Sequence, residues 1–240
     1  MFRYNRLLFT LLVLVWDICT VIDIYSAPNI VDCHRDDSIV LKCLAEGEQL
    51  YAEGNYPASL GQYIQGLEIS ERLCDPSLIA IFYKNMGNVY NMFGDGEKAL
   101  LLYERALIQN SIDTLTKHDV LMNLVRTAIS LDNLEKAKKA YREAVNMKYH
   151  RRYMDKFLEG FSHAMIIEKE GKYDRAVKEY VIMADSATKW ELDPRFETGT
   201  YEQIANSFLR RGINDSALVY MRKYVDIAEN TGRTHMFAGD

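Results

Sequence analysis

Residues 83–107 read YKNMGNVYNMFGDGEKALLLYERAL, and this stretch decides the fold. Two runs with helical spacing of apolar residues flank Gly94. A glycine at the end of a helix is favoured where the backbone needs a positive φ. Small residues stand at Gly87 and Ala99, one in each run, and Tyr103 follows four positions after the second. The stretch therefore predicts two antiparallel helices joined by a tight turn, which approach closely at the small residues.

The same pattern recurs along the chain at a nearly constant spacing. The clearest further copies are EGNYPASLGQYIQGL from residue 53, LDNLEKAKKAYREAV from residue 131 and EGKYDRAVKEYVIMA from residue 170. A more divergent copy, RGINDSALVYMRKYV, starts at residue 211. The five copies align on one small residue, at Ser59, Ala99, Ala137, Ala176 and Ala217, which gives spacings of 40, 38, 39 and 41 residues.

Two more columns of residues agree across the copies. Four positions after the small residue stands a tyrosine in four copies and Met221 in the fifth. Five positions before the small residue stands the residue of the turn, at Gly54, Gly94, Asp132, Gly171 and Gly212. Each unit is therefore a helix–turn–helix, and because a single pair cannot bury its own apolar face, the pairs are expected to stack into a solenoid.

The spacing of Gly87, Gly94, Ala99 and Tyr103 resembles the tetratricopeptide repeat. The resemblance implies an all-α fold, a right-handed solenoid of about five helix–turn–helix repeats over residues 40–231. Its repeats are expected near residues 40–73, 80–113, 118–151, 157–190 and 198–231.

The period departs from the 34 residues that are usual in this family. The extra residues fall between the second helix of one unit and the first helix of the next. Longer helices or short loops are expected at these four places, around Asp75-Pro76, Asp113, His150 and Asp193-Pro194.

The amino terminus has the pattern of an export signal. Arg3 and Arg6 precede Leu7–Trp16, a run of ten residues without a charge, which is shorter than a membrane span requires. Residues 1–27 are interpreted as a cleaved signal peptide or an uncleaved signal anchor, and a lipidated Cys19 is a weaker alternative. Each of these interpretations places the rest of the chain outside the cytoplasm, as a periplasmic or membrane-anchored protein. The remaining segments are a linker at 28–39 and a C-terminal tail at 232–240.

Composition and motifs indicate a binding protein rather than an enzyme. The net charge of −5 argues against nucleic acid as a partner. The sequence has no phosphate-binding loop, nucleophile motif or paired-carboxylate signature. His118, His150, His163 and His235 are too far apart for a local metal motif. Catalytic, cofactor-binding and metal-binding residues are therefore not predicted.

The resemblance also implies where a ligand would bind, because in this family positions 2, 5, 9 and 12 of each first helix line the concave wall. Lys84, Asn88 and Asn123 stand where some family members hold the C-terminal carboxylate of a peptide. Two alternatives remain open, namely that this register is shifted or that a neighbouring segment covers the wall. The predicted peptide-binding groove consists of Tyr51, Ile81, Lys84, Asn88, Asn91, Met122, Asn123, Arg126, Phe161 and Met165.

The sequence thus predicts a non-enzymatic scaffold or adaptor that binds a protein or peptide outside the cytoplasm. Contact with a membrane is expected only through a retained N-terminal segment. The alternative is the sensory ectodomain of a membrane-bound bacterial transcriptional regulator or histidine kinase, because exported repeats of this kind resemble the sensory regions of such proteins.

Overall fold

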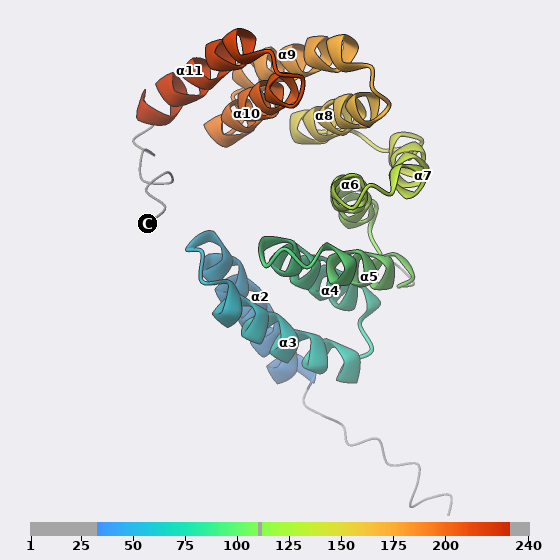
Figure 1. Cartoon of the computed structure of the whole chain (residues 1–240). Helices are drawn as coiled ribbons and strands as arrows, with labels where there is room; N and C mark the ends of the chain where they lie inside the picture. Colours follow the sequence, from blue (N-terminus) through green and yellow to red (C-terminus); the bar gives the residue numbers. More distant parts are fainter. Residues whose placement is uncertain (1–32, 110–111, 231–240) are drawn as a thin grey trace, which may run out of the picture.

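The computed structural model describes residues 33–109 and 112–230, which form ten helices and no strand. Consecutive helices pair as hairpins, and the five hairpins follow one another along an open arc (Figure 1). The predicted all-α solenoid is therefore confirmed, whereas the signal segment 1–27 and the tail 232–240 lie outside the described residues. The helices are α2 (Cys33–Ala52), α3 (Tyr56–Arg72), α4 (Pro76–Met92), α5 (Gly96–Leu107), α6 (Thr114–Ser130), α7 (Leu134–Val145), α8 (Tyr153–Lys169), α9 (Tyr173–Lys189), α10 (Pro194–Arg210) and α11 (Asn214–Asn230).

The extra residues of the long period lengthen the first helix of each pair. Helices α4, α6, α8 and α10 begin at residues 76, 114, 153 and 194, about one turn before the predicted repeats at 80, 118, 157 and 198. Asp75, Asp113 and Asp193 are the N-caps of α4, α6 and α10, and each carboxylate accepts a hydrogen bond from one or two backbone N–H groups of the first turn. The predicted linker 28–39 is partly wrong, because α2 already begins at Cys33.

In the turn inside each pair, the residue at the predicted position has a left-handed backbone conformation. The φ angles are 79° at Gly54, 77° at Gly94, 57° at Asp132, 79° at Gly171 and 72° at Gly212. A Cβ atom placed at any of these four glycines would meet no atom within 4 Å. Backbone conformation, rather than lack of space, therefore explains the glycine column.

Small residues and tyrosines fill the space between helices. Ala99 and Tyr103 are completely buried, and a Cβ atom at Gly87 would lie only 2.5 Å from Cε1 of Tyr103. This contact shows that α4 and α5 approach closely at the predicted small residues. In the fifth unit Met221 replaces the tyrosine and is 48% exposed, because none of the described helices packs on the far side of α11.

The last hairpin is expected to open first when the chain is probed in its native state. Only Ala217 and Ala228 of α11 are buried, so few apolar contacts resist local unfolding there. Amide hydrogen exchange should show weaker protection over residues 198–230 than over residues 80–145. Equal protection of the two regions would contradict this expectation.

Candidate peptide-binding surface

The first helix of each pair lines the inside of the arc. Figure 1 shows α2, α6, α8 and α10 nearer the inside of the arc than their partners α3, α7, α9 and α11, and α4 is in contact with α6. The residues of the predicted groove belong to α2, α4, α6 and α8, the first helices of the first four pairs.

A continuous polar network joins α4 to α6 on this wall. The Asn88 Oδ1 atom accepts hydrogen bonds from the Tyr103 hydroxyl and from Asn123 Nδ2, both at 2.8 Å. The Asn91 Nδ2 atom donates to the Tyr103 hydroxyl at 2.9 Å and to Thr127 Oγ1 at 2.8 Å. Burial raises the pKa of Tyr103, so its hydroxyl stays protonated and donates at neutral pH. Two of the predicted residues, Asn88 and Asn123, are therefore in direct contact. A third, Asn91, shares the Tyr103 hydroxyl with Asn88.

Two cations belong to the same part of the wall. The Arg126 guanidinium donates to Asn123 Oδ1, and Lys84 lies one turn before Asn88 on α4. Within the described residues, no carboxylate lies within ion-pair distance of Arg126 or Lys84. Burial lowers the pKa of Arg126 from its ordinary value of 12.5, but an arginine remains charged at neutral pH. The wall therefore carries two cations that form no ion pair within the described residues, and the carboxylate of Asp119 acts on Arg126 only at longer range.

The prediction that Met122 lines the groove is wrong, because Met122 is 0% exposed. Helix α8 packs directly against α6, and its Leu158 and Met165 lie against the core cluster that contains Met122. The adjacent Asn123 is partly exposed and takes the wall position instead.

The apolar residues predicted for the groove are only partly available to a ligand. Phe161 stacks on Phe157 with ring centroids 5.8 Å apart and packs against the core cluster of α8, α9 and α10. Tyr51 lies 5.3 Å from the ring of Tyr56, and Ile81 is half-buried. The part of the wall that a ligand can reach is therefore more polar than the repeat positions 2, 5, 9 and 12 predict.

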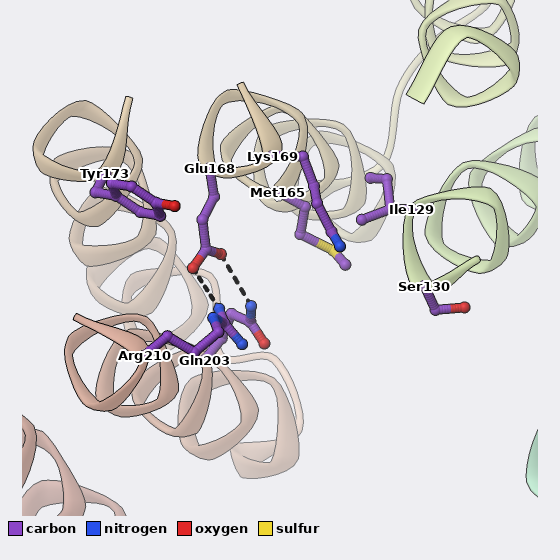
Figure 2. Close-up of a pocket in the computed structure, with 8 residues that line it drawn as sticks. All are labelled: Ile129, Ser130, Met165, Glu168, Lys169, Tyr173, Gln203 and Arg210. Carbon is purple, nitrogen blue, oxygen red and sulfur yellow. Dashed lines mark hydrogen bonds and ion pairs between the residues drawn. The ribbon is translucent and has the colours of Figure 1, made fainter. Parts of the chain in front are cut away.

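Further along the arc, a pocket of about 390 Å³ opens between α6, α8 and α10. Figure 2 shows Met165 and Lys169 of α8 extending toward Ile129 of α6, while Glu168 points toward Arg210 and Gln203. Ile129 and Ser130 belong to the last turn of α6, which follows Arg126 by one turn. The pocket therefore continues the polar network along the same helix.

Glu168 connects three elements at the bottom of this pocket. One carboxylate oxygen accepts hydrogen bonds from the Tyr180 hydroxyl and from Gln203 Nε2, both at 3.0 Å, and the other accepts from Arg210. Burial raises the pKa of Glu168, but these donors outweigh it, so the pKa lies below its ordinary value of 4.5. The buried carboxylate is therefore ionised and ties α8 to α9 and α10.

The sequence register does not reveal this arrangement around Glu168. Glu168 and Arg210 are 42 residues apart, and a charge at a wall position looks the same in sequence whether it is solvated or paired. The one local feature of the sequence that points to a buried Glu168 is its position directly after the apolar pair Ile166 and Ile167.

The comparisons with known proteins agree with this architecture. Residues 118–150 match the family model of the tetratricopeptide repeat. No curated protein matches the chain in sequence.

Several structures share the fold at low sequence identity. BtubC (BKLC) from P. vanneervenii superimposes with a TM-score of 0.59 at 16% identity, over 86% of each chain. The TPR-like repeats of a putative kinesin light chain from Podosopora anserina give a TM-score of 0.55 at 12% identity, over 86% of this chain and 100% of that one. The Cut9–Hcn1 hetero-tetramer of the APC/C gives 0.62 at 12% identity, over 80% of this chain and 34% of that one. The chain therefore contains a tetratricopeptide repeat at residues 118–150 and has the solenoid fold of tetratricopeptide-repeat proteins.

Proposed function

We propose that this protein is a non-enzymatic scaffold whose inner wall binds an extended peptide segment of a partner protein. Solenoids of stacked helix pairs present long concave surfaces, and such surfaces suit extended or helical peptides. The inner helices of this arc provide a surface of that kind, which runs from α2 to α10.

The observation that carries the proposal is the presence, beside the polar network, of two cations that form no ion pair within the described residues. Lys84 and Arg126 supply cations, and Asn88 and Asn123 supply amide groups in a fixed orientation. Amide and guanidinium donors of this type recognise carboxylates, and hydrogen bonds to charged groups contribute about 1.5–3 kcal/mol. The ligand is therefore proposed to present a carboxylate, at its C-terminus or on an acidic side chain, to this network.

A peptide array tests this proposal. Peptides attached through their N-termini, each made once with a free C-terminal carboxylate and once as the amide, are probed with the purified chain. Free acids should be captured in preference to amides. Lys84→Gln should reduce that capture about tenfold, because it removes one of the two cations.

The control is Lys178→Gln, which removes an exposed lysine from α9 on the outer wall. This variant should bind like the parent. Equal capture by Lys84→Gln and Lys178→Gln would contradict the proposed site.

The proposed location is outside the cytoplasm, on the basis of Arg3 and Arg6 ahead of the apolar run Leu7–Trp16. In the described part of the chain, no helix is long and apolar enough to cross a membrane. A free adaptor and the sensory ectodomain of a larger regulator would both use the inner wall in the same way.

Fusion of residues 1–40 to a reporter that is active only outside the cytoplasm tests the location. An active fusion is expected, and replacement of Arg3 and Arg6 together by glutamate should reduce its activity. A normally expressed but inactive fusion would contradict export.

A further inference from the structure

A buried histidine and two aspartates meet where α6 and α8 begin. Nitrogen and oxygen atoms of His118, Asp119 and Asp155 lie within 4.8 Å of one another. The side chains of His118 and Asp155 are both 0% exposed, whereas that of Asp119 is 31% exposed. The group therefore has an inner part that is fixed by packing and one side that is open to solvent.

The hydrogen bonds around His118 direct one ring nitrogen toward the two aspartates. Its Nε2 atom lies 3.1 Å from Glu159 Oε1, and that oxygen is also held by Arg151 Nε at 2.6 Å. Burial lowers the pKa of His118, but its partners Asp119 and Glu159 outweigh burial and raise the pKa to about 9. At neutral pH a metal ion therefore reaches the Nδ1 lone pair by displacing a proton, while Nε2–H continues to donate to Glu159. A carboxylate bound to the far nitrogen is the usual way in which metal-binding histidines are oriented.

The Nδ1 atom of His118 is buried and has no hydrogen-bond partner. It lies 4.0 Å from Asp119 Oδ1, which is too long for a hydrogen bond. Two ligand atoms on a tetrahedral ion with bonds of about 2.1 Å are about 3.4 Å apart, so the partly exposed Asp119 side chain would have to move slightly toward Nδ1. A bound cation would give this nitrogen a ligand bond and would close the gap to Asp119.

A cation already stands between the two carboxylates. Arg152 Nη2 lies 2.7 Å from Asp155 Oδ1 and 3.7 Å from Asp119 Oδ1. The Arg152 side chain is 49% exposed, so it can turn into solvent. The other oxygen of Asp155 is held by the backbone N–H of Arg152 at 2.8 Å, which would keep the carboxylate in place after the guanidinium leaves.

We propose that His118 Nδ1, Asp119 and Asp155 form a binding site for a divalent transition-metal ion of the zinc class. The ion replaces the Arg152 guanidinium between the two aspartates, and water completes the coordination on the exposed side. One nitrogen and two carboxylate oxygens are ligands that Zn²⁺ and Co²⁺ accept in proteins. A bound ion would join the third and fourth helix pairs.

Titration of the full chain with Co²⁺, followed by visible absorption, tests the site. Saturable binding of one ion per chain is expected, and Zn²⁺ should displace the Co²⁺. Asp119→Asn, at the partly exposed ligand, should weaken the affinity at least tenfold. Arg152→Gln should strengthen it, because the competing guanidinium is gone.

His150→Gln is the matched control, because it removes an exposed histidine from the same junction and should leave the affinity unchanged. Circular dichroism establishes that each variant is folded. Absence of saturable Co²⁺ binding to the parent would overturn the proposal, as would equal affinities of the parent and Asp119→Asn. Unchanged or weaker binding by Arg152→Gln would overturn the replacement of the guanidinium by the ion.

Discussion

Replacement of Gly87 by valine is expected to lower the free energy of unfolding by about 3 kcal/mol, at the upper end of the cost of overpacking a core. A Cβ atom at this position would lie 2.5 Å from Cε1 of Tyr103. The ring can move aside only at a large energetic cost, because Tyr103 is completely buried and its hydroxyl forms hydrogen bonds with Asn88 and Asn91. The measurement is urea denaturation followed by circular dichroism.

Gly61→Ala is the control for this substitution. Gly61 is exposed within α3, and a Cβ atom there would meet nothing within 4 Å. Alanine should stabilise the chain slightly, by about 0.5–1 kcal/mol, because it restricts the unfolded backbone and favours the helix. Coincident denaturation curves for Gly87→Val and the parent would show that α4 and α5 do not approach closely at Gly87.

The repeat pattern is sufficient to predict the helices because every unit meets the same packing requirement. The small residue of each second helix, such as Ala99 or Ala176, is completely buried, and each turn has a positive φ. These requirements depend on neighbours within one unit, so they recur in sequence at a constant spacing. Three of the longer first helices begin at aspartate N-caps, Asp75, Asp113 and Asp193, which stand among the extra residues of the long period.

The side chains on the inner wall depend on finer geometry than the repeats encode. Adjacent residues of a helix point about 100° apart, so a small rotation of α6 buries Met122 and presents Asn123. The rotation follows from the direct contact of α6 with α8, which the spacing of repeats does not show. Contacts between units, such as that of Glu168 with Arg210, have no local signature for the same reason.

Removal of the Glu168 carboxylate, by Glu168→Ala, should cost about 2 kcal/mol of stability, because a buried polar group left without a partner costs about 1–3 kcal/mol. The Tyr180 hydroxyl and the Gln203 amide would lose their acceptor, whereas Arg210 is exposed enough to find water. The measurement is a thermal melt at neutral pH. Glu202→Ala, which replaces an exposed glutamate of α10, is the control. Its free energy of unfolding should lie within about 0.5 kcal/mol of that of the parent.

The contribution of Glu168 should also depend on pH in a defined direction. Its pKa in the folded chain lies below the ordinary value of 4.5, so the unfolded state takes up the proton first. The stabilisation is therefore complete above pH 4.5 and is lost as the pH falls through the lower folded pKa. The difference between the parent and Glu168→Ala should shrink in acid, and a constant difference would contradict an ionised, hydrogen-bonded Glu168.

The proposed function requires that the inner wall recognise a carboxylate through Arg126 and its neighbours. The most direct test measures the affinity of the parent and of Arg126→Gln for one captured peptide, in its free-acid and amide forms. Arg222→Gln, at an exposed arginine of α11, is the control, and melts of all three chains establish that they are folded. The parent should bind the free acid at least about tenfold more tightly than the amide, a difference of about 1.4 kcal/mol. Arg126→Gln should lose most of that preference while it keeps its affinity for the amide. Equal binding of the two forms by the parent, or an unchanged preference in Arg126→Gln, would contradict the claim.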